Sequence, residues 1–118
     1  MTVVGIGMVP GVTADEVLAA VDAVLPAGRL DVRPDVRLAT LDTRADEPGL
    51  VEAAARRGWR VDAYPSSVLA AVRVPSPSAR VAELVGTPSV AEAAALVDGG
   101  TLTVVKTAHG RVTVAVAT

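Results

Sequence analysis

The stretch VVGIGMVPGVTADEV, residues 3–17, decides the fold class. It opens with an apolar run over residues 3–7 that ends in glycine, which is typical of a short buried strand. A loop with a Pro-Gly pair is expected over residues 8–12. Thr13 and Glu16 then have the spacing of a capping box, in which each side chain satisfies a backbone N–H of the other residue. A strand, a loop and a capped helix in this order predict an α/β fold.

Strand and helix signals alternate along the rest of the chain. The first helix is expected to run to about Leu25, where Pro26 and a glycine end it. Pro48 occupies a first helical position, and Ser89 with Glu92 repeats the capping box, so both mark helix starts. The further expected elements are strands over 36–41 and 59–63, helices over 48–57, 67–72, 78–85 and 91–97, and a hairpin of strands 102–105 and 112–116.

This pattern predicts a three-layer α/β/α sandwich with a mixed, partly parallel sheet that is closed by a C-terminal hairpin. A length of 118 residues suits one domain, and we expect residues 1–118 to form it. Half of the residues are hydrophobic, but they are mostly Ala and Val, with no Phe and with Trp59 and Tyr64 as the only aromatic residues. Such small side chains predict thin, tightly apposed layers.

Composition excludes several classes of function. The chain has no cysteine and one histidine, so neither a thiolate site nor a zinc site is expected, and no cofactor is predicted. A net charge of −2 and the scarcity of aromatic side chains argue against nucleic-acid binding. The N-terminus lacks a basic segment, and no apolar run reaches the roughly 18 residues of a membrane span. We therefore expect a cytoplasmic protein that binds neither nucleic acid nor membranes.

In open α/β sheets, ligands bind beyond the carboxyl ends of the parallel strands, and two loops are expected there. The first contains Gly7, Gly11 and Thr13. Its glycines allow the backbone to approach a ligand, and the N–H groups at the start of the following helix favour anions. The glycine spacing is not that of a dinucleotide-binding loop, and no phosphate-binding lysine follows. An ordinary strand-to-helix turn remains the alternative.

The second loop combines a hydroxyl group, carboxylates and a guanidinium group, carried by Thr40, Asp42, Arg44, Asp46 and Glu47. Arg44 is suited to bind a substrate carboxylate through two parallel hydrogen bonds. Asp46 or Glu47 is a candidate general base. The alternative for both is structural, because negative charge is also favoured at the start of a helix.

A single lysine, Lys106, stands among ten arginines, and it falls at the end of the first hairpin strand. It is a candidate cation at the rim of the site. The alternative is a solvated lysine that prevents the edge strand from pairing with another chain. His109 lies at the expected hairpin turn, where an exposed position is expected.

Four segments, taken together, resemble the CobE/CbiG C-terminal domain family of cobalamin biosynthesis. They are GIGMVPGVTADEV (5–17), TLDTRADEPGL (40–50), VPSPSARVAELVGTPSVAEAAAL (74–96) and VVKTAHGRVTVAVA (104–117). They occur in the order and spacing of the family, and VGTPSVAEAA (85–94) is the most specific part. The family fold implied by this resemblance is a small three-layer α/β domain.

The resemblance implies work on early corrin intermediates. CbiG proteins of the anaerobic route open the ring-A lactone of cobalt-precorrin-5A and release acetaldehyde, and they carry an additional N-terminal region. No such region precedes the match here, so the stand-alone CobE type is expected. Lys106 and Glu47 match the family pattern, whereas Arg44 stands where lysine is common. Met8 and its two successors stand where the family commonly carries Cys and Arg.

A precorrin is a large macrocycle with acetate and propionate arms, so its binder needs an apolar floor and a few cations at the rim. Arg44, Lys106 and Arg111 are the candidate cations, and the Ala/Val surface is the candidate floor. We therefore expect a protein that binds a precorrin-type tetrapyrrole intermediate, with Glu47 or Asp46 as the base if it opens the ring-A lactone.

Two other functions remain open at this stage. One is a non-catalytic interaction module that assists another cobalamin-pathway enzyme. The other is a small nucleotide- or phosphate-binding domain that uses the loop over residues 5–13.

Overall fold

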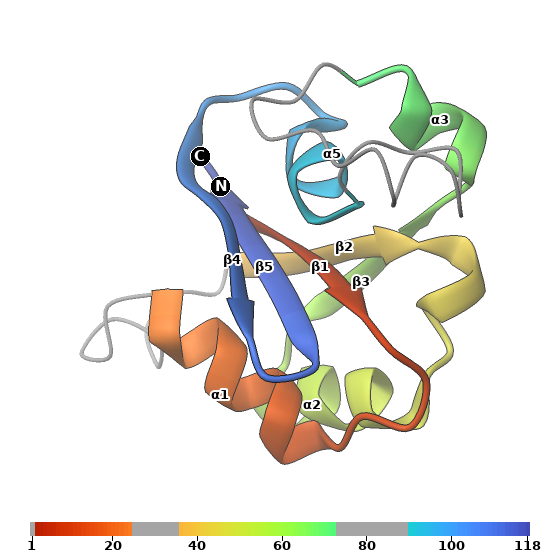
Figure 1. Cartoon of the computed structure of the whole chain (residues 1–118), viewed down its shortest axis with the longest axis vertical. Coiled ribbons are helices and arrows are strands. Elements are labelled where there is room, and N and C mark those ends of the chain that lie inside the picture. Colours follow the sequence, from red (N-terminus) through yellow and green to blue (C-terminus); the bar gives the residue numbers. More distant parts are fainter. Residues whose placement is uncertain (1, 25–35, 73–89) are drawn as a thin grey trace.

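In the computed structural model, one five-stranded sheet lies between helices on both of its faces (Figure 1). The structure describes residues 2–24, 36–72 and 90–118. The elements in this part of the chain are β1 (Thr2–Met8), α1 (Ala14–Val24), β2 (Val36–Leu41), the short 3₁₀ helix η2 (Asp42–Arg44), α2 (Pro48–Arg57), β3 (Arg60–Tyr64), α3 (Ser66–Ala70), α5 (Val90–Leu96), β4 (Leu102–His109) and β5 (Val112–Ala117).

The strand order in the sheet is β3-β2-β1-β5-β4, with β1 at the centre. Strands β1, β2 and β3 are parallel, while β5 is antiparallel to β1 and places Val116 opposite Val4. Strand β4 pairs with β5 as an antiparallel hairpin and forms one edge of the sheet. The predicted three-layer α/β fold with a mixed, partly parallel sheet and a C-terminal hairpin is therefore confirmed.

Helices α1 and α2 cover one face of the sheet, and α5 covers the other (Figure 1). The chain steps from β1 to β2 and from β2 to β3 in the same direction, and right-handed crossovers then place both connecting helices on one side. After β3 the chain returns across the sheet to β4, and α5 lies on the opposite face. The carboxyl ends of β1 and β2 are thus followed by loops that lead to helices of the same layer.

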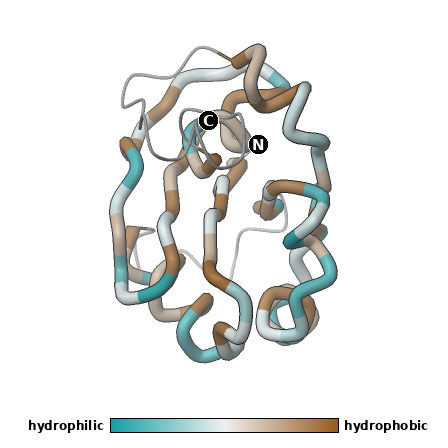
Figure 2. The backbone as a smooth tube through the Cα atoms, turned by 45° about the vertical axis from the view of Figure 1, so that its right-hand side comes forward, coloured by the Kyte–Doolittle hydropathy of each residue, from teal (hydrophilic) through white to brown (hydrophobic). Residues whose placement is uncertain are grey.

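The α1/α2 side holds the larger core. Strand residues of even number on β1, β2 and β5 point to this side and meet the apolar faces of the two helices. Along the central strands in Figure 2, hydrophobic residues alternate with paler, more neutral ones, as expected for this arrangement. The buried core residues on this side are Val4, Ile6, Val12, Ala14, Val17, Ala20, Val21, Val36, Leu38, Leu50, Ala53, Ala54, Trp59, Val112, Val114 and Val116.

Where α5 crosses β1 and β5, the α5 side is built from alanine and glycine, while Leu41 and Leu69 belong to the core on the same side nearer β2. Ala91 and Ala95 of α5 pack on Ala115 and Ala117 of β5. A Cβ atom at Gly5 would lie 1.8 Å from the carbonyl oxygen of Ala91, so the backbones of β1 and α5 are nearly in contact. The predicted thin layers are found on this side of the sheet.

The bounds of β1, α3, α5 and β5 differ from the sequence prediction by one or two residues, and three further differences have a structural reason. Strand β4 extends to His109, because residues 107–109 continue to pair with β5, so the turn is shorter than expected. Strand β3 begins at Arg60, because Trp59 turns into the core. Part of the predicted loop after β2 is the 3₁₀ helix η2.

Several predictions fall on residues outside the described ranges. These are the end of the first helix at Leu25, the helix over 78–85 and the capping role of Ser89. Among the helices that are described, none is both long and apolar enough to cross a membrane.

Candidate functional site

Two loops meet at the carboxyl edge of the parallel strands. The β1–α1 loop covers residues 9–13, and the β2–α2 loop covers residues 42–47. A Cβ atom at Gly49, in the first turn of α2, would lie 2.2 Å from the carbonyl oxygen of Val12, so the first loop rests directly on the start of α2. This close approach requires glycine. The two loops predicted to carry the site are therefore neighbours in space.

A hydrogen bond joins the two loops. The backbone N–H of Gly11 donates to Oε1 of Glu47 over 2.8 Å. Glu47 precedes α2 in the N-cap position, but its side chain makes no capping hydrogen bond to that helix. The carboxylate of Glu47 thus binds the neighbouring loop, which distinguishes it from the purely capping alternative.

The predicted capping box at the start of α1 is confirmed. The backbone N–H of Glu16 donates to Oγ1 of Thr13 over 3.1 Å, and the N–H of Thr13 donates to Oε1 of Glu16 over 3.2 Å. The N–H groups of Gly11 and Thr13 therefore both bind carboxylates of the chain itself. A bound phosphate would have to compete for these donors, and this argues against the phosphate-binding alternative.

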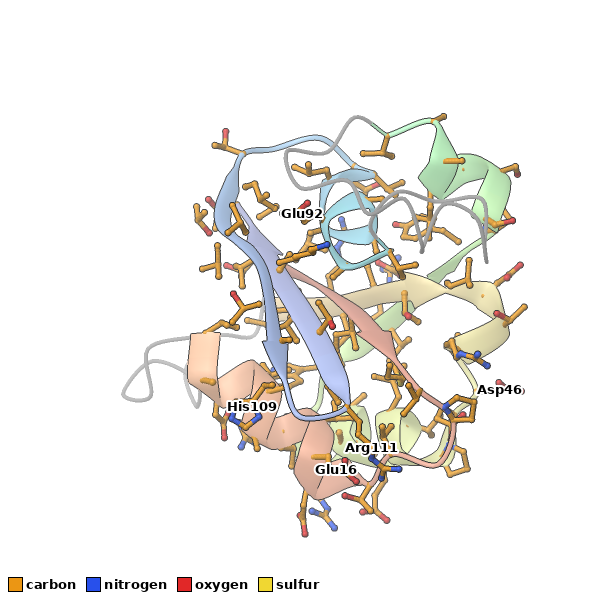
Figure 3. The ribbon with its side chains drawn as sticks, in the orientation of Figure 1. Glu16, Asp46, Glu92, His109 and Arg111 are labelled. Atoms are coloured by element: carbon orange, nitrogen blue, oxygen red, sulfur yellow. The ribbon has the colours of Figure 1, made fainter. Side chains whose placement is uncertain are left out.

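Arg111, a candidate rim cation, forms an ion pair with Glu16 of the same chain. Its Nε donates to Oε2 of Glu16 over 2.8 Å, and its Nη2 donates to the carbonyl oxygen of Gly11 over 3.2 Å. Figure 3 shows Arg111 and Glu16 side by side at the end of the molecule where the hairpin turns. The Arg111 guanidinium, followed by the N–H of Thr13, lowers the pKa of Glu16 from 4.5 to about 2. The pair is therefore charged across the physiological pH range.

Thr40 lies within strand β2 and Gly7 within strand β1, so neither residue is on the loops that follow these strands. The hydroxyl group of Thr40 is fully buried and donates to the carbonyl oxygen of Ile6 over 2.7 Å, where the pairing of β1 with β2 ends. Gly7 is half-buried on the other side of β1, and a Cβ atom there would meet Val90 of α5 at 3.8 Å. Both residues shape the base of the candidate site.

The remaining polar residues of the second loop point outwards. Asp42 and Asp46 are exposed, and Asp46 lies at the outer rim of the molecule in Figure 3. Arg44, at the end of η2, is half-buried. Within the described ranges, its guanidinium has no hydrogen-bond or ion-pair partner. Among the described residues, Arg44 is thus a cation of this rim without a protein partner.

Lys106 lies at a different place. It is on β4, which is separated from β2 by β1 and β5, so about 14 Å of sheet width lies between the two strands. Val105 and Lys106 together form a bulge, because the pairing with β5 shifts between Val104 and Thr107. The loop pair does not include Lys106, and a bulge with a lysine on an edge strand also suits the alternative, protection of that edge.

The sequence analysis missed the role of Glu92. Its side chain is fully buried on α5, and its Oε2 accepts a hydrogen bond of 2.9 Å from the backbone N–H of Lys106. Glu92 thereby satisfies a donor that the bulge leaves out of the strand pairing. No sequence signal near Lys106 points to this contact.

The chemistry of the rim is acid–base and electrostatic. Within residues 2–24, 36–72 and 90–118, no group of three or more His, Asp or Glu residues could hold a metal ion. His109 is exposed as predicted, but it is the last residue of β4 and pairs with Val112, so it does not lie in the turn. The side chains that the rim presents are the carboxylate of Glu47 and the guanidinium of Arg44.

These features define a small α/β domain with a candidate ligand-binding edge made of two joined loops. Comparison with known proteins gives its family: residues 2–117 match the family described as "Cobalamin synthesis G C-terminus", and the chain belongs to this family. The resemblance stated from the sequence is therefore confirmed.

Similar proteins include one curated enzyme and two solved structures. The chain is 31% identical over 116 residues to cobalt-precorrin-5A hydrolase of Priestia megaterium, a match that covers 97% of this chain and 31% of the hydrolase. The crystal structure of CobE, a protein from the cobalamin (vitamin B12) biosynthetic pathway, superimposes with a TM-score of 0.86 at 30% identity, covering 99% of this chain and 92% of CobE. Cobalamin biosynthesis protein chiG from Agrobacterium tumefaciens has a TM-score of 0.72 at 37% identity, covering 99% and 97% of the two chains.

The chain is thus a cobalamin-biosynthesis protein that is related to a part of cobalt-precorrin-5A hydrolase. It spans about a third of the length of that hydrolase.

Proposed function

We propose that this chain binds a precorrin-type tetrapyrrole intermediate at the edge formed by the β1–α1 and β2–α2 loops. The observation that carries the proposal is the hydrogen bond of 2.8 Å between Gly11 and Glu47, which makes one continuous rim of the two loops in a member of a cobalamin-biosynthesis family. The guanidinium of Arg44, which has no partner among the described residues, lies on this rim. It is suited to bind an acetate or propionate arm through two hydrogen bonds.

Apolar contact for the macrocycle is available on the same two segments. Val9 in the first loop and Val51 in the first turn of α2 are exposed, at 46% and 50%. Both segments of the candidate site thus carry an exposed apolar side chain. A flat macrocycle with carboxylate arms needs both kinds of contact, and this combination supports a tetrapyrrole more than a small hydrophilic ligand.

We further propose that the chain contributes to opening of the ring-A lactone of (cobalt-)precorrin-5A, and the name of the relative from P. megaterium, cobalt-precorrin-5A hydrolase, supports this. Hydrolysis adds water to the lactone carbonyl and breaks the ring C–O bond, and acetaldehyde release follows. Glu47 would take the proton from the attacking water, with its carboxylate oriented by the N–H of Gly11. Asp46, exposed on the same loop, is the second candidate base.

The binding proposal is tested by titrating the purified protein with a corrin-pathway intermediate and following its visible absorbance. Arg44→Ala is expected to weaken binding about tenfold or more, because a hydrogen-bonded charge pair is lost. Arg56→Ala is the matched control, since Arg56 is an exposed arginine that is already paired with Glu52 and Asp15. If Arg44→Ala and the wild-type protein bind the intermediate with equal affinity, the binding site does not lie on this rim.

Two further measurements extend this test. Lys106→Ala is expected to have a smaller effect than Arg44→Ala, because β4 lies across the sheet from this rim. For catalysis, acetaldehyde release from the lactone intermediate is measured for the wild-type protein, Glu47→Gln and Asp46→Asn. No release by the wild-type protein, alone or with pathway partners, would end the hydrolytic part of the proposal.

A second candidate function is a non-catalytic module that assists another cobalamin-pathway enzyme. It is favoured by the match to the hydrolase, which covers only 31% of that protein, so most of the hydrolase has no counterpart in this chain. Co-purification with pathway enzymes separates the two functions. A specific enzyme partner, together with no binding of tetrapyrroles, would support the module.

A further inference from the structure

Arg111 reaches across the end of the molecule from the hairpin to the candidate site. It directly precedes β5, and its side chain is half-exposed. Three of its groups contact the β1–α1 segment: Nε and Nη2 donate to the carboxylate of Glu16, Nη2 also donates to the carbonyl oxygen of Gly11, and the backbone oxygen accepts from Val9 over 3.4 Å. The two bonds to Glu16 fix the plane of the guanidinium.

Gly11 is an exposed loop residue whose backbone N–H and carbonyl oxygen are both hydrogen-bonded. Its φ angle is +88°, a conformation that side chains disfavour, and no atom lies within 4 Å of the position that a Cβ would take. Arg111 binds its carbonyl oxygen over 3.2 Å, and Glu47 accepts from its N–H over 2.8 Å. The orientation of this residue therefore depends on two charged side chains, Glu47 and Arg111, that are 64 residues apart in the sequence.

We infer that Arg111 is a positioning residue of the candidate site: by holding the carbonyl side of Gly11, it directs the N–H of Gly11 at Glu47 and so fixes the carboxylate of Glu47 at the rim. Glu16 holds the guanidinium in place, and its own position is set by the capping box with Thr13. The effect of this geometry on ligand binding rests on the proposed function, whereas the geometry itself does not.

The geometry is tested by NMR on the full chain labelled with ¹⁵N. In the wild-type protein, the hydrogen bond to Glu47 is expected to move the amide proton signal of Gly11 downfield, and Glu47→Ala, which removes the acceptor, should abolish this shift. Arg111→Gln is expected to remove most of the shift and to speed hydrogen exchange at Gly11 roughly tenfold, because the loop is released. Arg111→Lys, which keeps a cation, should restore part of the shift.

Two controls separate positioning from general loss of structure. Arg56→Gln removes another exposed, paired arginine and should leave the Gly11 signal unchanged. The amide signal of Glu16 reports the capping box, which does not require Arg111, and should stay in place in Arg111→Gln. A wild-type amide proton signal of Gly11 in Arg111→Gln would overturn the inference.

The functional consequence is measured by the same absorbance titration as above. If the wild-type protein binds the intermediate, Arg111→Gln should weaken binding severalfold, to the level of Glu47→Gln. Unchanged binding by Arg111→Gln would overturn the claim that this positioning serves the site. If the wild-type protein binds no intermediate while Gly11 responds as expected, the positioning by Arg111 stands and the proposed function fails.

Discussion

On the α1/α2 side of the sheet, side chains of Val, Leu and Ile fill the space between strands and helices, whereas on the α5 side the helix backbone lies almost directly on β1. Neighbouring residues of one strand belong to the two different sides. On β2, Leu38 points towards α1 and α2, and Ala39 points towards α5. Both side chains are fully buried.

The difference shows that the same Ala/Val-rich composition supports two kinds of packing. On the α1/α2 side the free energy of folding comes from the volume of buried side chains, so removal of atoms should be costly there. On the α5 side it depends on close approach of the backbones, so addition of atoms should be costly. Opposite substitutions on the two sides therefore test the comparison directly.

The largest effect is expected for Gly5→Ala. The new Cβ would lie 1.8 Å from the oxygen of Ala91 and 2.7 Å from the nitrogen of Ala95, and both are backbone atoms that cannot rotate away. We expect a loss of about 3 kcal/mol or more in the free energy of unfolding, or failure to fold, as for severe overpacking. Urea denaturation measures the loss.

Gly7→Ala is the matched control on the same strand and the same side. Its new Cβ would be 3.8 Å from Val90, an ordinary van der Waals contact. The expected change is below about 1 kcal/mol, because no overpacking results. Similar losses for the two variants would mean that α5 does not rest on β1 at Gly5.

The second-largest losses of stability are expected for substitutions at the adjacent positions 38 and 39, whose side chains point to opposite sides of the sheet. Leu38→Ala should cost about 3 kcal/mol, since it leaves a cavity in the larger core. Ala39→Leu should cost about 2 kcal/mol, because α5 leaves no room for the added atoms. Differential scanning calorimetry of both variants checks this reciprocity. If Ala39→Leu does not lower the stability, α5 can move away from the sheet, and the packing on the two sides of the sheet is less different than the structure indicates.

A third, smaller effect is expected at Thr40, the buried hydroxyl group on the α1/α2 side. Thr40→Val keeps the shape of the side chain but removes the donor to the carbonyl oxygen of Ile6. The expected loss in unfolding free energy is about 1 kcal/mol. Thr40→Ser, which keeps the hydroxyl group, is the comparison, and a smaller loss for Thr40→Val than for Thr40→Ser would contradict a role of the hydrogen bond.

Local sequence patterns were sufficient for much of the fold. The spacing of Thr13 and Glu16 predicted the capping box, and glycine and proline at the ends of elements predicted the alternation of strands and helices. Each of these signals lies within a few residues of the structure that it predicts.

The contacts that build the site could not be predicted in this way. Glu16 and Arg111 are 95 residues apart, and they meet only because β5 pairs with β1 and brings the hairpin to the β1–α1 loop. The contact of Glu92 with Lys106 depends on a bulge in β4. The need for glycine at residue 5 depends on where α5 crosses the sheet. All three depend on strand order and register, which a single sequence does not specify.

The smallest effect is expected where neither kind of packing acts, at the exposed pair of Glu16 and Arg111. Because the folded-state pKa of Glu16 is about 2, below its ordinary value of 4.5, ionised Glu16 favours the folded state above pH 4.5, and this contribution is lost as the pH falls towards 2. Glu16→Gln lacks this contribution at every pH. The difference in melting temperature between the wild-type protein and Glu16→Gln should therefore be constant above about pH 5 and should shrink between pH 4.5 and 2.

The same pH series on Leu38→Ala gives the contrast, because that variant changes packing and no charge at the pair. The difference in melting temperature between Leu38→Ala and the wild-type protein should stay constant between pH 4.5 and 2. If the Glu16→Gln difference also stays constant down to pH 2, Glu16 is not held ionised by Arg111. The contacts at the loop edge would then contribute to stability independently of pH, as the packing contacts of the interior do.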